Sequence, residues 1–426
     1  MLEVINGAAI ALVLKVLGAG LTFLFNLVLA RTLGAEGAGL YFLALTVTTI
    51  ATVFGRMGLD NTLLRFTAAN VAVENWVTVR GVYVKGMKLA FIVSSISAIV
   101  VFLFAPVLAE KLFQKPELVI PMRWMALAIV PMTVLILHAE LLKGIKRIRD
   151  SLLVFGVGVP AISLIVLYFL GGSNGVLGAV WAYSIGAIFA AFIGVILWFV
   201  ATPEIRNISG VFQTKELLQS SIPLFWIALL NMLISWTATF ALGIWGTEEE
   251  VGIFSMASRT AMLTSLILTS VNSISAPKFA ELYKKKDMTT LGATARSTAK
   301  LMTFIVSPFL LLFLIAPQWV MGIFGEEFQK GGILLSILAI GQFVNVSTGS
   351  VGYLLMMTGN EKLMRNNVAF VAFLCIFLCV LFVPKYGSLG AVIATSISLS
   401  LQNVIAMFLV SYRLGINTVS WFKIKC

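Results

Sequence analysis

The chain has 426 residues, of which 60% are hydrophobic and only 11% are charged, and its formal net charge is +12. Soluble globular proteins carry charge on about a quarter of their residues, so this composition, with a mean hydropathy of +1.02, excludes a soluble domain and indicates a membrane protein. The excess of basic residues predicts no nucleic-acid partner, because its distribution along the chain follows the pattern of membrane topology.

Twelve predicted transmembrane helices follow one another along the chain. Each window holds about 20 predominantly apolar residues, enough to cross a hydrocarbon core of roughly 30 Å as an α-helix. The first window lacks a preceding basic region and is too long for a signal-peptide core, so we expect it to be retained. The predicted fold class is therefore an all-α integral membrane protein. The windows are 6–30, 39–58, 86–108, 120–142, 151–170, 176–200, 218–242, 252–275, 299–317, 331–357, 367–383 and 389–412.

The Lys and Arg residues outside the windows gather on one side of the predicted membrane. The even-numbered loops and the C-terminal tail carry 22 of them, and the odd-numbered loops carry six. The positive-inside bias then places both termini in the cytoplasm. The internal loops predicted to face the cytoplasm are 59–85, 143–150, 201–217, 276–298 and 358–366.

The second half of the chain repeats the first. The stretch GVLGAVWAYSI at residues 175–185 returns as GSLGAVIATSI at residues 387–397, with eight of eleven positions identical and an offset of 212 residues. Because each repeat holds six helices and starts on the same side, we expect two pseudo-symmetric lobes related by an axis along the membrane normal. The predicted lobes are residues 1–200 and 218–426, joined by a cytoplasmic linker at 201–217. Two such lobes suit transport by alternating access, although duplication could also build a larger static bundle.

Two positive charges, Lys15 and Arg259, fall inside windows that contain no Asp or Glu to neutralise them. A charge within the hydrocarbon costs several kcal/mol, so it indicates a function unless the side chain snorkels to the surface. Lys15 lies about ten residues, or roughly 15 Å, into its predicted helix. Arg259 lies about seven residues from the end of its window, so snorkelling remains the alternative for both. Arg31, at the outer end of the first window, is more ambiguous.

Small polar residues recur at helical spacing on the same helices. Lys15 heads a stripe that continues through Gly18, Thr22 and Asn26, and comparable stripes occur on the seventh and eighth windows. We expect these stripes to line a wet cavity, the alternative being tight helix packing through small residues. The stripes of the seventh and eighth windows include Asn231, Ser235 and Asn272.

The middle of every window lacks an acidic residue, whereas a proton-coupled exporter of organic cations is expected to hold an intramembrane carboxylate. A cationic cavity instead favours an anionic cargo, and phosphate or pyrophosphate is the head group that Arg and Lys bind well.

The cysteines form no disulfide or metal pattern, and no phosphate-binding loop or nucleophile arrangement occurs. The sequence therefore predicts no metal, no cofactor and no enzyme activity. His138, near Glu140 and Lys143, is predicted to be a solvated helix end rather than a catalytic residue.

Three segments together resemble a known family: LVLARTLGAEGAGLYFLA (27–44), FGRMGLDNTLLRFTAAN (54–70) and GIFSMASRTAMLTSLILTSVNSISAPKFAELY (252–283). They are similar to the polysaccharide biosynthesis family of oligosaccharide-lipid flippases, part of the multidrug/oligosaccharidyl-lipid/polysaccharide exporter superfamily. The resemblance implies a V of helices 1–6 and 7–12 around a central cationic cavity. It also implies switching that carries an isoprenoid-pyrophosphate-linked sugar unit across the membrane.

The same resemblance assigns residues to the cavity. Arg31 and Arg259 sit where the related flippases of the lipid-linked peptidoglycan precursor carry cavity arginines, and Arg56 and Arg65 lie in the second-loop motif. The chain has twelve windows rather than fourteen and lacks the fuller set of arginines in helix one, which argues against a peptidoglycan precursor as cargo.

The sequence therefore favours a flippase for lipid-linked oligosaccharide in the cytoplasmic membrane, serving cell-surface polysaccharide assembly. Its expected partners are the lipid-pyrophosphate-linked oligosaccharide, membrane lipid, and glycosyltransferases or a polymerase of the same pathway; the coupling ion is not specified. Two alternatives stay open: a multidrug exporter coupled to sodium or protons, and a membrane scaffold of a polysaccharide-assembly complex.

Overall fold

The computed structural model describes residues 2–418, apart from the side chains of residues 2–9, 12, 171–173, 273, 274 and 277. Within that range the chain is helical and contains no strand. The predicted cytoplasmic tail beyond Thr418 lies outside the described residues. The helices are α1 (Leu2–Arg56), α2 (Leu59–Val71), α3 (Trp76–Pro106), η1 (Val107–Leu112), η2 (Pro116–Leu118), α4 (Val119–Ala126), α5 (Ile129–Gly144), α6 (Ile148–Ser151), η3 (Leu152–Gly158), α7 (Val159–Ala201), η4 (Pro203–Ile205), α8 (Thr214–Trp245), α9 (Glu248–Lys284), α10 (Met288–Ile315), α11 (Pro317–Gly322), η5 (Glu326–Gly331), α12 (Gly332–Ser347), α13 (Val351–Met357) and α14 (Glu361–Leu414).

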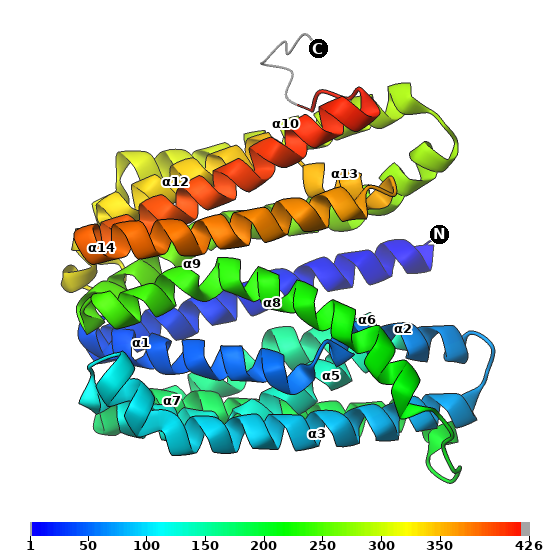
Figure 1. Ribbon diagram of the computed structural model, residues 1–426, viewed down its shortest axis with the longest axis horizontal. Helices are drawn as coiled ribbons and strands as arrows, with labels where there is room; N and C mark the ends of the chain where they lie inside the picture. Colours follow the sequence, from blue (N-terminus) through cyan, green and yellow to red (C-terminus); the bar gives the residue numbers. More distant parts are fainter. Residues whose placement is uncertain (1, 419–426) are drawn as a thin grey trace. The chain divides into compact units, whose positions relative to one another are not determined.

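The helices of the described chain account for all twelve predicted spans. Nine are long and apolar enough to cross a membrane, and the pair α4 and α5, bent by 44°, supplies a tenth. Two of the nine, α1 and α14, would each be about 80 Å long if straight, far more than the roughly 30 Å of a hydrocarbon core. Each is interrupted by a glycine with non-helical backbone angles, Gly34 in α1 and Gly387 in α14. Figure 1 shows both helices doubling back, which brings the count to twelve.

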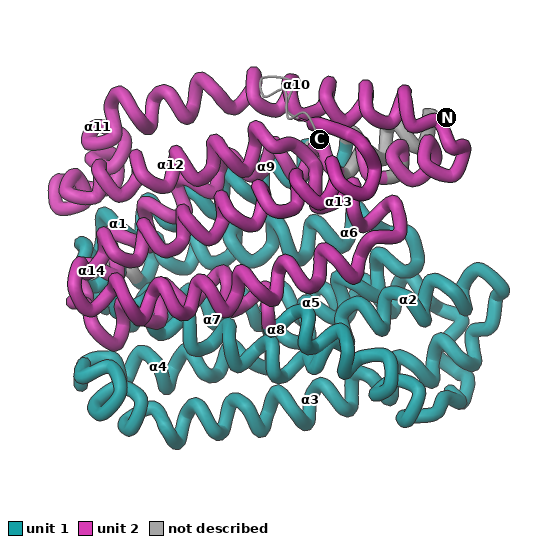
Figure 2. The backbone as a smooth tube through the Cα atoms, turned by 45° about the horizontal axis from the view of Figure 1, so that its top comes forward, with its two compact units in different colours: residues 1–229 teal, residues 230–426 magenta. Residues whose placement is uncertain are grey.

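The described residues group into two compact units, residues 1–229 and 230–426 (Figure 2). In the first unit, α1 packs against α7 and α3, and α5 packs against α2 and α7. In the second unit, α12 lies against α14, α10 and α9, while α13 packs on α14. The division falls inside α8, so the first part of the seventh predicted helix groups with the six helices that precede it.

Backbone geometry repeats within the two units at the offset found in the sequence. Gly175 in α7 has φ 52° and ψ −133°, and Gly387 in α14, 212 residues later, has φ 54° and ψ −131°. Three residues beyond each break, Gly178 and Gly390 lie so close to the carbonyl of the preceding helix arm that a Cβ would collide with it. The duplication inferred from sequence is therefore also a duplication of the hairpin that joins the last two spans of each half.

The buried cores repeat in the same way. One cluster in the first unit includes Val79, Leu142 and Trp198, and a cluster in the second unit includes the residues 212 positions later. All of these side chains are at most 1% exposed. Each half therefore builds its own apolar core from matching positions. The residues of the second cluster are Leu291, Leu354 and Val410.

Two of the segments between the predicted spans are largely helical. Most of 59–85 belongs to α2 and α3, and most of 276–298 belongs to α9 and α10. A hydropathy window detects only the apolar part of a helix, whereas these helices continue beyond it as amphipathic ends. In the linker 201–217, the aromatic ring of Phe212 packs on Phe66 with ring centroids 5.1 Å apart, so this segment is attached to the first unit.

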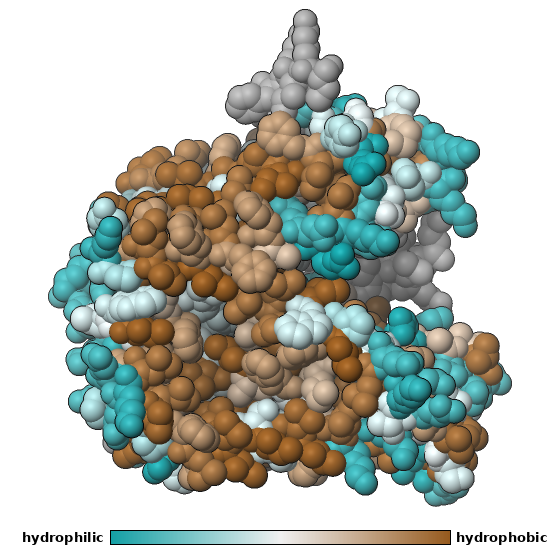
Figure 3. Space-filling model, in the orientation of Figure 1, coloured by the Kyte–Doolittle hydropathy of each residue, from teal (hydrophilic) through white to brown (hydrophobic). Residues whose placement is uncertain are grey.

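The surface along α3 is that of a helix facing lipid. Several of its large apolar side chains are exposed, including Phe91 (56%), Ile96 (55%) and Leu103 (63%). In Figure 3, hydrophobic residues cover the middle of this part of the first unit, and hydrophilic ones gather toward its ends. Soluble proteins rarely expose an apolar surface of this extent, so the helix is suited to contact with acyl chains.

Candidate functional site

Arg259 lies in the middle of a candidate membrane span. Helix α9 begins at Glu248 because Thr247 and Glu250 form a capping box: the Thr247 hydroxyl accepts from the Glu250 N–H at 3.2 Å, and the Glu250 carboxylate accepts from the Thr247 N–H at 3.1 Å. Arg259 is eleven residues from that start, or about 16 Å along the axis, which is deeper than the window 252–275 suggested. Its side chain is half-buried.

Polar side chains lie along the same helix. Within the described residues, the Ser255 hydroxyl and the Asn272 side-chain carbonyl are buried without a hydrogen-bond partner. One turn and a half beyond Arg259, Ser265 donates to the side-chain oxygen of Gln342 in α12 at 3.1 Å. The second unit thus holds a polar face on α9 whose hydrogen-bonding capacity is partly unused.

Sequence reasoning missed the residues on the other side of this contact. Gln342 also accepts from the Asn345 amide at 3.1 Å, and both residues are buried in α12. Two amide side chains inside the apolar window 331–357 were the available signal. A hydrogen-bonded chain of this kind within a membrane span orients its members and holds α9 and α12 together.

The predicted stripe on the seventh helix lies in α8. Asn231 and Ser235 are both exposed, and the Ser235 hydroxyl donates to the Asn231 backbone carbonyl at 3.0 Å. A hydroxyl bonded to its own helix does not hold a neighbouring helix. Both side chains therefore contribute polar surface on α8.

The stripe on α1 has a mixed environment. A Cβ on Gly18 would collide with the carbonyl of Gly156 in η3, so this step of the stripe serves close helix packing. Thr22 is exposed and donates to the Gly18 carbonyl at 2.8 Å, and Asn26 is buried. Lys15 is half-buried and stands nineteen residues before the break at Gly34, about 28 Å along the axis. That is nearly a full hydrocarbon thickness from the turn, so Lys15 lies near one end of its span.

Arg31 occupies the opposite end of the same span. It is exposed and stands three residues before the Gly34 break. Arg31 and Arg259 are each engaged in an interaction within the structure, so neither is an isolated cation.

Arg56 and Arg65 make separate contacts, Arg56 at the junction of α1 and α2 and Arg65 farther along α2. Arg56 forms an ion pair with Asp60 at 2.9 Å, and the exposed Arg65 donates to the Ser220 hydroxyl of α8 at 2.8 Å. Thr62 shares that hydroxyl at 3.3 Å. Both arginines therefore lie at the end of the first unit where α8 begins.

The expectation that His138 is a solvated helix end is wrong. Its side chain is 1% exposed, because α5 continues to Gly144 and the ion pair of Glu140 with Lys143 forms the end instead. His138 Nδ1 lies 2.8 Å from the Val134 carbonyl and therefore donates to it, which leaves Nε2 to accept from the Tyr83 hydroxyl at 3.3 Å. The imidazole links α5 to α3 as a packed, neutral group.

The described residues contain no group of three or more His, Cys, Asp or Glu side chains placed to hold a metal ion. The polar features of the site are instead a mid-span arginine, amides and hydroxyls. Such groups can bind an anion or a sugar, and they hold no arrangement of nucleophile and base.

These features define a multi-pass helical membrane protein built from a duplicated unit of six spans, with a cation in the middle of one span. A sequence model of the family described as "Polysaccharide biosynthesis protein" matches residues 4–283, well over half of the chain. The chain belongs to this family.

Known proteins similar to this chain cover nearly its whole length. The probable low-salt glycan biosynthesis flippase Agl15 of Haloferax volcanii is 23% identical over 426 residues, covering 96% of this chain and 85% of that protein. The structure of an inward-facing multidrug resistance transporter of the MATE family, in the MOP superfamily, matches with a TM-score of 0.75 at 16% identity. The match covers 96% of this chain and 98% of the transporter chain. The structure of the lipid II flippase MurJ, in an inward closed conformation, matches with a TM-score of 0.74 at 16% identity. The match covers 94% of this chain and 87% of the MurJ chain. The two structures share their fold with this chain.

Proposed function

We propose that the chain is a flippase that moves an isoprenoid-pyrophosphate-linked oligosaccharide across the cytoplasmic membrane by alternating access, for cell-surface polysaccharide assembly. The observation that carries the proposal is the similarity, over 96% of the chain, to a protein named as a probable glycan flippase. Membership of the polysaccharide biosynthesis family supports the same class of cargo.

The placement of charge supports an anionic cargo over an organic cation. In residues 10–418, every Asp and Glu lies within about one turn of a helix end, a helix break or a connecting turn. An exporter of cations that exchanges protons uses a carboxylate within the membrane, and the described spans hold none at mid-length. The mid-span charge of α9 is the guanidinium of Arg259, which can bind a phosphate through two parallel hydrogen bonds.

In this proposal Arg259 binds the pyrophosphate of the cargo, and Lys15 and Arg31 are further cations along its path. The polar residues of the path are Thr22, Asn26, Asn231, Ser235 and Asn272. The hydroxyls and amides suit the sugar, whose hydroxyl groups both donate and accept hydrogen bonds.

Thermal stability of the purified full-length protein tests the class of cargo, because a ligand that binds only the folded protein stabilises it, by about 2.7 kcal/mol at 100 times its Kd. We expect a higher melting temperature with a polyprenyl pyrophosphate and no change with tetraphenylphosphonium. Stabilisation by the organic cation alone would support a multidrug exporter. No response to either compound would support a scaffold without cargo.

The cytoplasmic location of both termini is tested by cysteine labelling in intact cells, in a variant whose Cys426 is replaced by Ser. Cys375 and Cys379 are buried and give little background. From the distribution of basic residues, we expect Glu326→Cys to react with an impermeant thiol reagent and Thr289→Cys to react only after permeabilisation. Both positions are exposed in the structure. The reverse labelling pattern would invert the orientation.

A further inference from the structure

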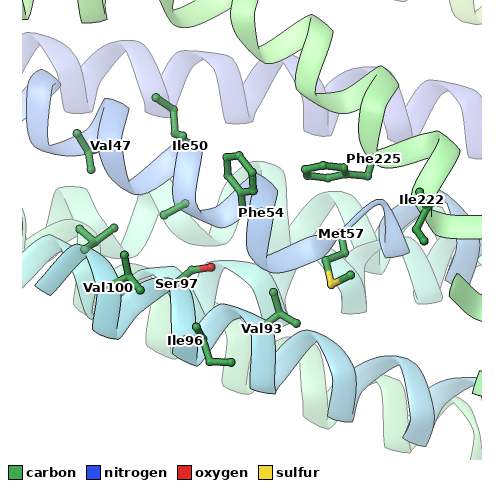
Figure 4. A pocket seen from close by; sticks show the side chains of 12 residues that line it. Val47, Ile50, Phe54, Met57, Val93, Ile96, Ser97, Val100, Ile222 and Phe225 are labelled. Atoms are coloured by element: carbon green, nitrogen blue, oxygen red, sulfur yellow. The ribbon is translucent and has the colours of Figure 1, made fainter. Parts of the chain in front are cut away.

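The first unit contains an apolar pocket of about 550 Å³ formed by the second arm of α1, by α3 and by the first part of α8 (Figure 4). All three segments belong to residues 1–229, so the pocket is complete within one unit. Its lining side chains come from Val47, Ile50, Ala51, Phe54, Met57, Val93, Ile96, Ser97, Val100, Val101, Ile222 and Phe225.

The pocket is elongated, apolar and open to the surroundings. Along α1 it extends from Val47 to Met57, about 15 Å. Ser97 is the single residue with a polar side chain among the lining residues, and Phe54 and Ile222 remain 43% and 48% exposed. An open apolar channel of this length fits a hydrocarbon chain rather than a sugar or an ion.

One end of the pocket is closed by the contact of α8 with the α1–α2 junction. The ring of Phe225 packs on Phe54 with centroids 5.4 Å apart. Gly58, at φ 71°, allows this approach, because a Cβ there would collide with the backbone of Ser221 and Phe225. The pocket therefore ends at the segment that carries the polar residues of the junction.

Two arginines belong to the helices that meet at this closed end. Arg56 directly precedes the lining residue Met57 in α1, and Arg65 bonds to Ser220, which belongs to the same turn of α8 as the lining residue Ile222 but points to another face of that helix. Asp60 offsets the charge of Arg56 through their ion pair. Arg65 is exposed and has five N–H donors, of which one is directed to Ser220, so it has donors left for an anion.

We propose that this pocket is a loading site for the lipid-linked cargo, with the prenyl chain in the pocket and the pyrophosphate bound by Arg65, assisted by Arg56. The inference rests on the proposed function. The distribution of basic residues predicts that this end of the first unit faces the cytoplasm, the side from which the proposed cargo is taken up. The site therefore collects cargo from the inner leaflet before it reaches the mid-span cation of α9.

The phosphate supplies most of the selectivity at this site. Moving a prenyl chain from bilayer to pocket gains little hydrophobic energy, because acyl chains are as apolar as the pocket wall. Charge-assisted hydrogen bonds from arginine to phosphate have no equivalent in the hydrocarbon. A polyprenol without phosphate should consequently occupy the pocket much less than the pyrophosphate.

The test uses the full-length protein in phosphatidylcholine nanodiscs with a polyprenyl pyrophosphate that carries a photoactivatable diazirine on its chain. We expect cross-links to map to peptides that contain the lining residues of α1, α3 and α8. Arg65→Ala should reduce this labelling at least about tenfold, and Arg65→Lys should reduce it less. Lys88→Ala removes an exposed cation of α3 that does not line the pocket and should leave labelling unchanged.

A second pair of variants tests the pocket itself. Ser97→Trp fills the space between α1 and α3 and should reduce labelling about tenfold, whereas Ile99→Trp, on the exposed face of the same helix, should not. If Ser97→Trp lowers the melting temperature, Val100→Trp, which replaces an exposed lining residue, takes its place.

Competition identifies the occupant. Unlabelled polyprenyl pyrophosphate should remove the labelling, while polyprenol and phosphatidylglycerol should have little effect. Equal competition by phosphatidylglycerol would make the pocket a general phospholipid contact and overturn the proposal, as would labelling outside the pocket. Absent labelling together with intact flipping would refute the loading site alone. Pocket labelling in a protein that flips no prenyl-linked sugar would instead refute the proposed function.

Discussion

Arg259→Ala is expected to reduce flipping of the lipid-linked cargo at least about 30-fold, because losing the charge-assisted hydrogen bonds of the guanidinium to the pyrophosphate costs at least about 2 kcal/mol. The residue lies eleven positions into α9, in the middle of a candidate span. A positive charge at that depth costs free energy, so its presence indicates a function. Arg259→Lys should retain partial activity, because the charge remains while the two-pronged geometry is lost. Arg259→Glu should be inactive, since a carboxylate repels the pyrophosphate.

The measurement is polymer production in a host that lacks its own flippase, alongside a melting temperature for each purified variant. Arg365→Ala is a matched control, because it removes an exposed arginine of the same unit from the start of α14. Full activity of Arg259→Ala would show that this arginine does not contact the cargo. Arg259 has an interaction partner within the protein, so an equally large loss of folding would assign it a structural role.

Gly387→Ala is expected to destabilise the protein by about 3–5 kcal/mol. An alanine at φ 54° and ψ −131° is strained by about 1–3 kcal/mol. Its Cβ would also collide with the carboxylate of Glu250. That carboxylate accepts from the N–H groups of Ser388 and Thr247, at 3.1 Å each, and thereby caps the starts of two helices. Displacing it costs roughly a further 1 kcal/mol for each bond.

The internal repeat provides the control for this prediction. Gly175 has nearly the same backbone angles, and a Cβ there would meet no atom within 4 Å. Gly175→Ala should therefore introduce only the backbone strain, without a steric clash, and the free energy of unfolding should fall by about 1–3 kcal/mol. Glu250→Ala combined with Gly387→Ala should be less than additive, because both changes remove the same caps. Equal destabilisation by the two glycine variants would show that the contact with Glu250 contributes nothing.

The sequence by itself determined the class of fold, the twelve spans and the duplication. Each of these depends on a local property: a run of apolar residues long enough for a bilayer predicts a span, whatever it later packs against. The match between 175–185 and 387–397 predicted the duplication, and the backbone angles of Gly175 and Gly387 agree with it, because a glycine that precedes the same apolar helix can adopt the same angles in both halves. The midpoint cation Arg259 was also visible in the sequence, although its depth was underestimated because the capping box lay outside the apolar window.

Only the tertiary structure decided which polar residues meet. Arg65 bonds Ser220 across 155 residues, and His138 meets Tyr83 across 55 residues, so no periodicity within one helix could have paired them. A helical wheel places residues on one face of a helix but does not determine what covers that face. The same limit explains why Gly18, predicted to be part of a cavity stripe, packs on Gly156, and why the apolar pocket between α1, α3 and α8 was not predicted. Hydropathy is a property of a single segment, whereas a contact involves two segments. Only the packing of the folded chain determines which two segments meet.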